Sequence, residues 1–253
     1  MNPESFFAIG VSVPLVTLII SFGRSLGIGT NSIMSRELGG NDLMGTYNSI
    51  LHGIVACFVI GFGLMLSTFF LKYILIYIGA ASSMELSMQY LTPIFLCSWV
   101  FIFSNFFANT LQAEGNSKTP TVLLILTNIL NLILDLIFIF AFGWGVSGAA
   151  YATVLSSGVG AVYILYWYLS GKSEIPIKFK YFKPGIVYDI FLVALPNFLT
   201  DSLWCITILF FNKILIGQLG QIGILLYHNM ARIPQLCDKL GSVICYILNK
   251  SIC

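Results

Sequence analysis

The stretch from Thr119 to Gly143 reads TPTVLLILTNILNLILDLIFIFAFG, and it holds one carboxylate, Asp135, within a run of Leu, Ile and Phe. Its length suits the roughly 20 apolar residues that an α-helix needs to cross a bilayer. A charged side chain at the centre of such a helix costs about 2.5–3.5 kcal/mol on insertion scales. Asp135 therefore needs a polar partner or a function. Asn131 lies one helical turn earlier on the same face, so the two side chains can converge on one ligand.

The composition is that of a polytopic, all-α membrane protein. The chain has 253 residues, of which 58% are hydrophobic and 9% are charged, whereas about 25% of the residues of an ordinary soluble protein are charged. Too few charged residues exist to coat a soluble globule, so we expect much of the surface to contact membrane lipid. The net charge of +2 comes from thinly spread Lys and Arg residues. Without a basic stripe, no nucleic-acid partner is predicted.

Six apolar segments predict six membrane-spanning helices, at about residues 6–33, 49–78, 86–111, 119–143, 149–169 and 187–217. A polar loop is predicted from Ser35 to Tyr47, with its turn at Gly39-Gly40-Asn41-Asp42. Residues 223–253 predict at most the start of a seventh helix, because charged residues and a proline interrupt it. These residues are Arg232, Pro234, Asp238 and Lys239.

The distribution of Lys and Arg among the loops predicts the orientation in the membrane. The loops after the second and fourth spans contain no Lys or Arg. The loops after the first, third and fifth spans contain Arg36, Lys118, Lys172, Lys178, Lys180 and Lys183. We therefore expect the longest hydrophilic stretch, residues 170–185, to be cytoplasmic and Met1 to start outside. An outside start without a signal peptide suggests that a preceding helix is missing, or that the first span inserts alone.

Several short motifs resemble those of the multidrug and toxic compound extrusion (MATE) transporters, in the polysaccharide and lipid flippase superfamily. The turn LGGND at Leu38–Asp42 resembles the family's LGAGD turn. Three further stretches agree in order and spacing: LQAEGN at 111–116, NLILD at 131–135 followed by Ile137-Phe138, and GWGVSGAAYAT at 143–153. The sixth span, with Leu195-Pro196, is similar to the family's seventh helix. The resemblance extends over about residues 6–223.

This resemblance implies helices two to seven of the family's twelve, with part of the eighth. Residues 1–170 would form the first bundle without its first helix, residues 171–185 a cytoplasmic linker, and residues 186–253 the truncated start of the second bundle. An acidic residue that archaeal-type members carry on the first helix would be absent. A complementing chain that carries the missing helices is therefore a candidate partner.

The resemblance also implies a cation site, made of Asp135 and Asn131 with Asn105 on the preceding helix and Thr153 on the following one. Carboxylate, amide and hydroxyl oxygens are the donors that a hard cation such as Na⁺ prefers. A proton would need Asp135 alone. Apart from Na⁺ or H⁺ as the coupling ion, no cofactor, metal site or catalytic residue is predicted. Alternatively, Asp135 only forms hydrogen bonds that hold helices together.

Two further polar residues are candidates for the transport path. Asn128, one turn before Asn131, continues the polar face of its helix. Many relatives carry an acidic residue on the helix that contains Asp201, but that residue could also lie near the cytoplasmic end and reach water. Arg24, in the first span, is interpreted as a side chain that extends to the membrane interface. Gly23 and Gly27 form a G-x-x-x-G pair, which favours close helix packing.

The resemblance implies a secondary active efflux transporter of the cell membrane that exchanges Na⁺ or H⁺ for cationic or amphipathic drugs. A lipid or polysaccharide flippase of the same superfamily is an alternative, although it would need a large cationic cavity, and we expect Arg24 to be the only buried cation before the linker. A second alternative is a non-transporting truncated remnant. A membrane-embedded enzyme is the last, because the sequence lacks the G-x-x-x-x-G-K-[ST], H-E-x-x-H and G-x-S-x-G motifs. The G-x-G-x-x-G match at 143–148 is interpreted as a loop between helices.

Overall fold

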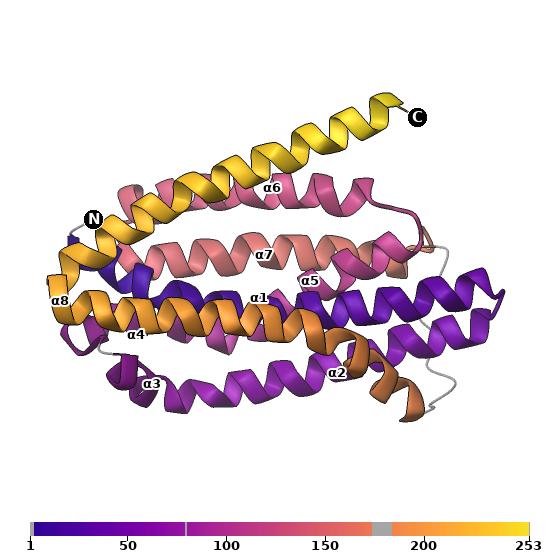
Figure 1. The fold of residues 1–253 in the computed structure, drawn as a ribbon, viewed down its shortest axis with the longest axis horizontal. Helices are drawn as coiled ribbons and strands as arrows, with labels where there is room; N and C mark the ends of the chain where they lie inside the picture. The colour runs from indigo at the N-terminus through magenta and orange to yellow at the C-terminus, as the bar shows by residue number, and fades with distance from the viewer. Residues whose placement is uncertain (1–2, 79, 174–183, 253) are drawn as a thin grey trace.

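The computed structural model describes residues 3–78, 80–173 and 184–252, and it describes side chains up to residue 218. These residues form helices joined by short turns and contain no strand, which confirms the all-α prediction (Figure 1). The α-helices are α1 (Pro3–Gly39), α2 (Leu43–Leu66), α3 (Leu71–Ile78), α4 (Met84–Leu96), α5 (Ser98–Ala113), α6 (Lys118–Asp135), α7 (Gly145–Leu169) and α8 (Pro184–Ile252). Two 3₁₀ turns, Ser67–Phe70 and Ala80–Ser83, flank α3, and a π-helix, Leu136–Ala141, continues α6.

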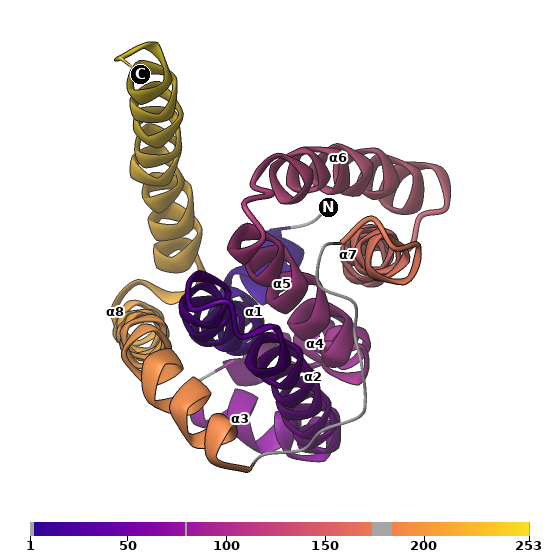
Figure 2. The same cartoon turned by 90° about the vertical axis from the view of Figure 1, so that its right-hand side faces the viewer.

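Helix α1 is the centre of the bundle. It packs against α2, α5 and α8, and its buried residues Phe7, Val11 and Ile19 belong to the main apolar core. Seen along the bundle in Figure 2, α6 and α7 lie on one side of α1 and α5, while α8 lies on the opposite side. The first part of α8 therefore meets the rest of the chain mainly through α1.

The surface of the bundle is apolar, as expected for a protein in lipid. Large side chains such as Phe58, Leu124, Val162 and Phe210 are each at least 60% exposed, although soluble proteins rarely expose large apolar patches. Five helical segments of the described chain are long and apolar enough to cross a membrane, or six when the bent pair α4–α5 counts as one span. The six predicted spans are thus present, and the chain is a multi-pass membrane protein.

The predicted polar loop at residues 35–47 is much shorter than expected. Helix α1 continues to Gly39 and α2 begins at Leu43. Asp42 is the N-cap of α2 and accepts a hydrogen bond from the Gly45 amide at 2.9 Å. Asn41, with φ at 60°, makes the turn that the sequence places here. The charged residues before the turn remain helical because a helix end at the membrane surface can expose them to water.

The third predicted span is bent by 55° between α4 and α5, at Cys97. Pro93 lies one turn before the bend and lacks the amide hydrogen that would continue the helical bonding. The Cys97 amide donates to the Pro93 carbonyl at 3.0 Å, so the chain turns immediately after this bond. Pro14 and Pro196 lie inside α1 and α8 without ending either helix.

Small residues allow α1 to approach its neighbours closely, as the G-x-x-x-G pair predicts. A Cβ atom on Gly27 would lie 2.9 Å from the Phe106 carbonyl oxygen of α5, and one on Gly23 would overlap the Ile102 backbone. On the other side, a Cβ atom on Gly29 would lie 2.6 Å from the Ile190 carbonyl oxygen of α8. Both interfaces of α1 therefore depend on positions without a side chain.

The C-terminal part of the chain is helical further than the sequence predicts. Helix α8 continues to Ile252, so the expected interruption of the helix after residue 223 is wrong for the backbone. Its ribbon changes direction partway, and the last part extends away from α1 (Figure 2). Residues 174–183 of the predicted cytoplasmic linker lie outside the described residues.

Candidate functional site

Four of the predicted site residues surround one polar cavity of about 340 Å³ between α5, α6 and α7. Asn105 reaches it from α5, Asn128 and Asn131 from α6, and Thr153 from α7. Further hydroxyl groups line the same cavity, from Ser104, Thr127, Ser156 and Ser157. The helix face that carries the asparagines in α6 thus lines the same cavity as polar side chains of α5 and α7.

Two of the asparagine amides are oriented by their own helices. The Asn105 Nδ2 atom donates to the Phe101 carbonyl oxygen at 2.9 Å, and the Asn128 Nδ2 atom donates to the Leu124 carbonyl oxygen at 2.7 Å. Each nitrogen atom thus donates one of its two hydrogens within its own helix, and neither nitrogen can ligate a cation. The side-chain oxygen atoms are therefore the groups that these amides offer to a ligand in the cavity.

Thr153 connects three helices at this site. Its hydroxyl donates to the Ala149 carbonyl oxygen at 2.8 Å, and the Asn131 Nδ2 atom of α6 lies 3.5 Å from the same hydroxyl oxygen, at the outer limit of a hydrogen bond. Tyr90 of α4, which is 9% exposed, also forms a side-chain hydrogen bond with Thr153 and interacts electrostatically with Asp135.

Sequence reasoning missed Tyr90. The available signal was weak: a tyrosine in an apolar span needs a partner for its hydroxyl when it is buried. That requirement does not identify the partner, because Tyr90 and Thr153 lie far apart in the sequence and on different helices. The bend at Cys97 separates α4 from α5, and α4 packs against α7.

Asp135 lies one turn beyond Asn131, at the last residue of α6 and directly before the π-helix Leu136–Ala141. It does not line the 340 Å³ cavity itself. Its Oδ1 atom is buried and has no hydrogen-bond partner among the described residues. A buried carboxylate oxygen without a partner is costly and needs a proton or a cation nearby. π-helical segments are frequent at functional sites, which fits this position.

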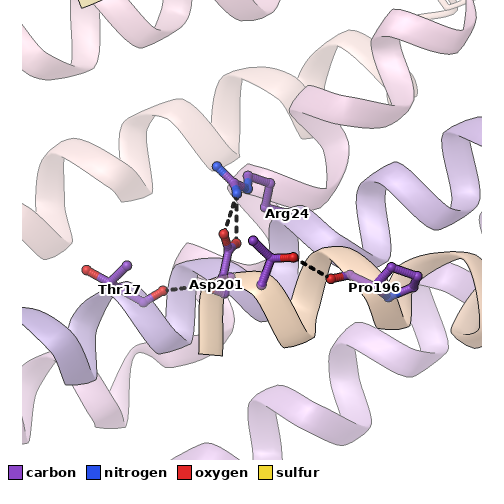
Figure 3. A network of polar contacts seen from close by, with 6 residues as sticks. Thr17, Arg24, Pro196 and Asp201 are labelled. Carbon is purple, nitrogen blue, oxygen red and sulfur yellow. Dashed lines mark hydrogen bonds and ion pairs between the residues drawn. The ribbon is translucent and has the colours of Figure 1, made fainter. Parts of the chain in front are cut away.

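The remaining candidate, Asp201, lies apart from this cavity and pairs with Arg24 (Figure 3). The Arg24 Nη2 atom lies 2.6 Å from Asp201 Oδ1 and 2.8 Å from Asp201 Oδ2. Arg24, interpreted from the sequence as a side chain that extends to the membrane interface, instead pairs with a residue of α8. Asp201 is 18% exposed, so its carboxylate is largely covered rather than free in water.

The arrangement supplies oxygen atoms of three kinds from three helices. Asn105, Asn131 and Thr153 provide neutral donors, and Asp135 provides a negative charge one turn away along α6. Such a set suits a hard monovalent cation, while Asp135 alone is sufficient to bind a proton. The residues present therefore fit the expected coupling ion.

These features define a multi-pass helical membrane protein with a polar site inside its bundle. An ionisable residue such as Asp135 within a membrane span marks a candidate functional site. The MatE family model matches residues 3–137, more than half of the chain, and the chain belongs to this family. The predicted resemblance is thus confirmed.

Curated relatives and solved structures agree. The chain is 28% identical to the multidrug export protein MepA of Staphylococcus saprophyticus over 251 residues, which cover 94% of this chain and 55% of MepA. It is 32% identical to the probable multidrug resistance protein YpnP of Bacillus subtilis over 175 residues, which cover 68% of this chain and 39% of YpnP. An inward-facing multidrug resistance MATE family transporter of the MOP superfamily matches with a TM-score of 0.89 and 30% identity, covering 93% of this chain and 55% of that one. The chain therefore spans about half the length of the relatives that it matches.

Proposed function

We propose that this protein takes part in cation-coupled efflux of small organic molecules across the cell membrane, with Na⁺ or H⁺ moving in the opposite direction. The observation that carries the proposal is the buried, unpartnered Oδ1 atom of Asp135 beside a cavity of amide and hydroxyl oxygens. The names of the relatives, a multidrug export protein and a probable multidrug resistance protein, support a small-molecule substrate.

In this proposal, Asp135 is the group that gains and loses the coupling ion. Its negative charge attracts the ion, and the neutral oxygens of Asn105, Asn131 and Thr153 complete the shell when the ion is Na⁺. Tyr90 is a positioning residue, because its hydrogen bond holds Thr153 at the junction of α4 and α7. Asn128 extends the polar lining of the cavity away from Asp135.

The motion that links the ion to the substrate would be a rearrangement of the helices before the linker against the helices after it. Helix α8 is the described part of the second group, and it packs on α1 of the first. The chain spans about half the length of its relatives, so the substrate path would also include helices beyond those described here.

The test is the accumulation of ethidium in bacterial cells that lack their own efflux pumps. Wild-type protein should lower the accumulation, and Asp135→Asn should abolish this effect, because the amide carries no charge. Asp42→Asn is the matched control: it makes the same chemical change at the N-cap of α2, where Asn caps about as well as Asp.

Equal accumulation in cells with wild-type protein and in cells with empty vector would reject efflux by this chain alone. If the same result held when helices equivalent to the rest of the relatives' length were also present, it would favour the non-transporting remnant. Normal export by Asp135→Asn would reject the assigned role of Asp135 and leave the efflux proposal standing.

A further inference from the structure

The contact between Arg24 and Asp201 joins two helices in the interior of the membrane. With a rise of 1.5 Å per residue, Arg24 lies about 22 Å along α1 from Gly39, and Asp201 lies about 26 Å along α8 from Pro184. The hydrocarbon core is about 30 Å thick, so both charges lie far from the ends of their helices. Charges at this depth are rare and are retained for a reason.

The two partners differ in how much of their side chains is exposed. Asp201 is 18% exposed, whereas Arg24 is 50% exposed, and one Arg24 nitrogen atom makes both contacts with the carboxylate. Within the described residues, the other guanidinium nitrogens make no hydrogen bond. Arg24 can therefore leave with little loss, while Asp201 would keep a largely covered carboxylate that needs another cation.

The hydroxyl groups of Ser21 and Thr200 do not replace Arg24. Ser21 donates to the Thr17 carbonyl oxygen at 2.8 Å, and Thr200 donates to the Pro196 carbonyl oxygen at 2.9 Å, each within its own helix (Figure 3). Once Arg24 departs, no described neighbour supplies a second positive charge to Asp201. A cationic group from outside the described residues would pair with Asp201 in its place, whereas a neutral molecule would leave the carboxylate unpaired.

Aromatic rings line the same interface between α1 and α8. The ring centres of Phe22 and Phe198 are 4.4 Å apart, and both rings line a cavity of about 200 Å³ together with Phe191 and Ser25. The Oγ atom of Ser25 is buried there without a partner among the described residues. Asp201 follows Phe198 by three residues and so continues the same face of α8. Aromatic faces beside a carboxylate suit an organic cation.

We infer that Arg24 is an internal counter-ion for Asp201, which the cationic group of a transported molecule replaces. Arg24 and the substrate compete for one carboxylate, so binding of the substrate breaks the ion pair between α1 and α8 and loosens this interface. The inference rests on the proposed efflux function and adds a second site to it, distinct from Asp135. A permanently charged aromatic cation is the class of ligand that it selects.

The test is binding of ethidium to the purified full chain in detergent, measured by fluorescence anisotropy. Arg24→Gln removes the competitor and should strengthen binding by about three- to tenfold, because the lost contact is a charge-assisted hydrogen bond that the half-exposure of Arg24 weakens. Asp201→Asn should weaken binding by a similar factor. The double variant should behave like Asp201→Asn, because Arg24 acts only through that carboxylate.

The opposite signs separate this role from a structural one. If the pair only stabilised the fold, both single variants would lower the melting temperature and weaken ethidium binding together, and that result would overturn the inference. Lys172→Gln is the control for loss of one positive charge, since Lys172 lies beyond α7 over the rings of Tyr166 and Trp167. It should leave the affinity unchanged.

A second measurement follows the interface itself. In a variant without native cysteines, Ser25→Cys should react slowly with a maleimide, because Ser25 is 2% exposed, and ethidium should accelerate the reaction. With Arg24→Gln added, the reaction should be fast without ethidium. If neither ethidium nor Arg24→Gln changed the rate of the maleimide reaction, the inference would be overturned and the Asp135 proposal would remain. If no variant bound ethidium, the inference would fall, and the Asp135 proposal would still be decided by the efflux assay.

Discussion

The Nδ2 atom of Asn131 lies 3.5 Å from the Oγ1 atom of Thr153, so α6 and α7 meet through polar side chains at the cavity. Both residues supply an oxygen to the proposed cation site. Asn131→Ala and Thr153→Val should therefore each raise the cation concentration needed for half-maximal ethidium efflux by about tenfold. Each variant loses one contact to a charged ligand, which is worth about 1.5 kcal/mol.

Thr121→Val is the control for this pair. Thr121 lies on the exposed side of α6 and donates to the Ser117 carbonyl oxygen, away from the cavity. Its loss should leave the cation dependence unchanged. If the double variant Asn131→Ala/Thr153→Val showed no greater loss than the control, the two side chains would not be ligands.

Tyr90→Phe tests the positioning role at the junction of α4 and α7. The ring stays, but the hydrogen bond with Thr153 is lost, which should lower the free energy of unfolding by about 1 kcal/mol. The half-maximal cation concentration should also rise, by less than for Thr153→Val. Thermal unfolding in detergent and the efflux assay measure the two effects. Tyr188→Phe, at a side chain that is 69% exposed on α8, should change neither.

Much of the fold follows from the sequence, because apolar length and turn chemistry are local. The span ending at Leu169 and the turn at Asn41 are present as predicted. The boundary after the first span was wrong, since Arg36 and Glu37 are polar yet remain helical. Hydropathy reports contact with lipid, whereas helix formation also continues where the chain enters water.

The site was predictable only in part. Asn131 and Asp135 share a helix, so their spacing alone places them together. The cluster with Asn105 and Thr153 came from the resemblance, and the cavity brings both beside Asn131. The Arg24–Asp201 pair and the Tyr90–Thr153 bond depend on how distant helices pack. No local pattern encodes these long-range contacts, so the sequence does not show which residues pair.

The predicted orientation is open to direct measurement. In a variant without native cysteines, Ser117→Cys lies in the turn between α5 and α6, and Ala141→Cys lies near the other end of α6; both positions are exposed. Positive residues are retained on the cytoplasmic side, so an impermeant maleimide should label position 141 in intact cells and position 117 in inside-out vesicles. The reverse labelling pattern would show that the Lys and Arg residues of the loops do not predict the orientation of this protein in the membrane.

The close approach of α1 and α8 at Gly29 predicts which small change the interface cannot accept. A methyl group there would lie 2.6 Å from the Ile190 carbonyl oxygen and 3.1 Å from the Ala194 Cβ atom, so Gly29→Ala must push α8 away from α1. Overpacking of this kind costs about 1–3 kcal/mol, and the melting temperature should fall accordingly. Gly63→Ala makes the same change on α2, where nothing lies within 4 Å, and should be neutral or slightly stabilising because Ala favours the helix. Equal melting temperatures for the two variants would show that α8 does not pack on α1 as closely as described.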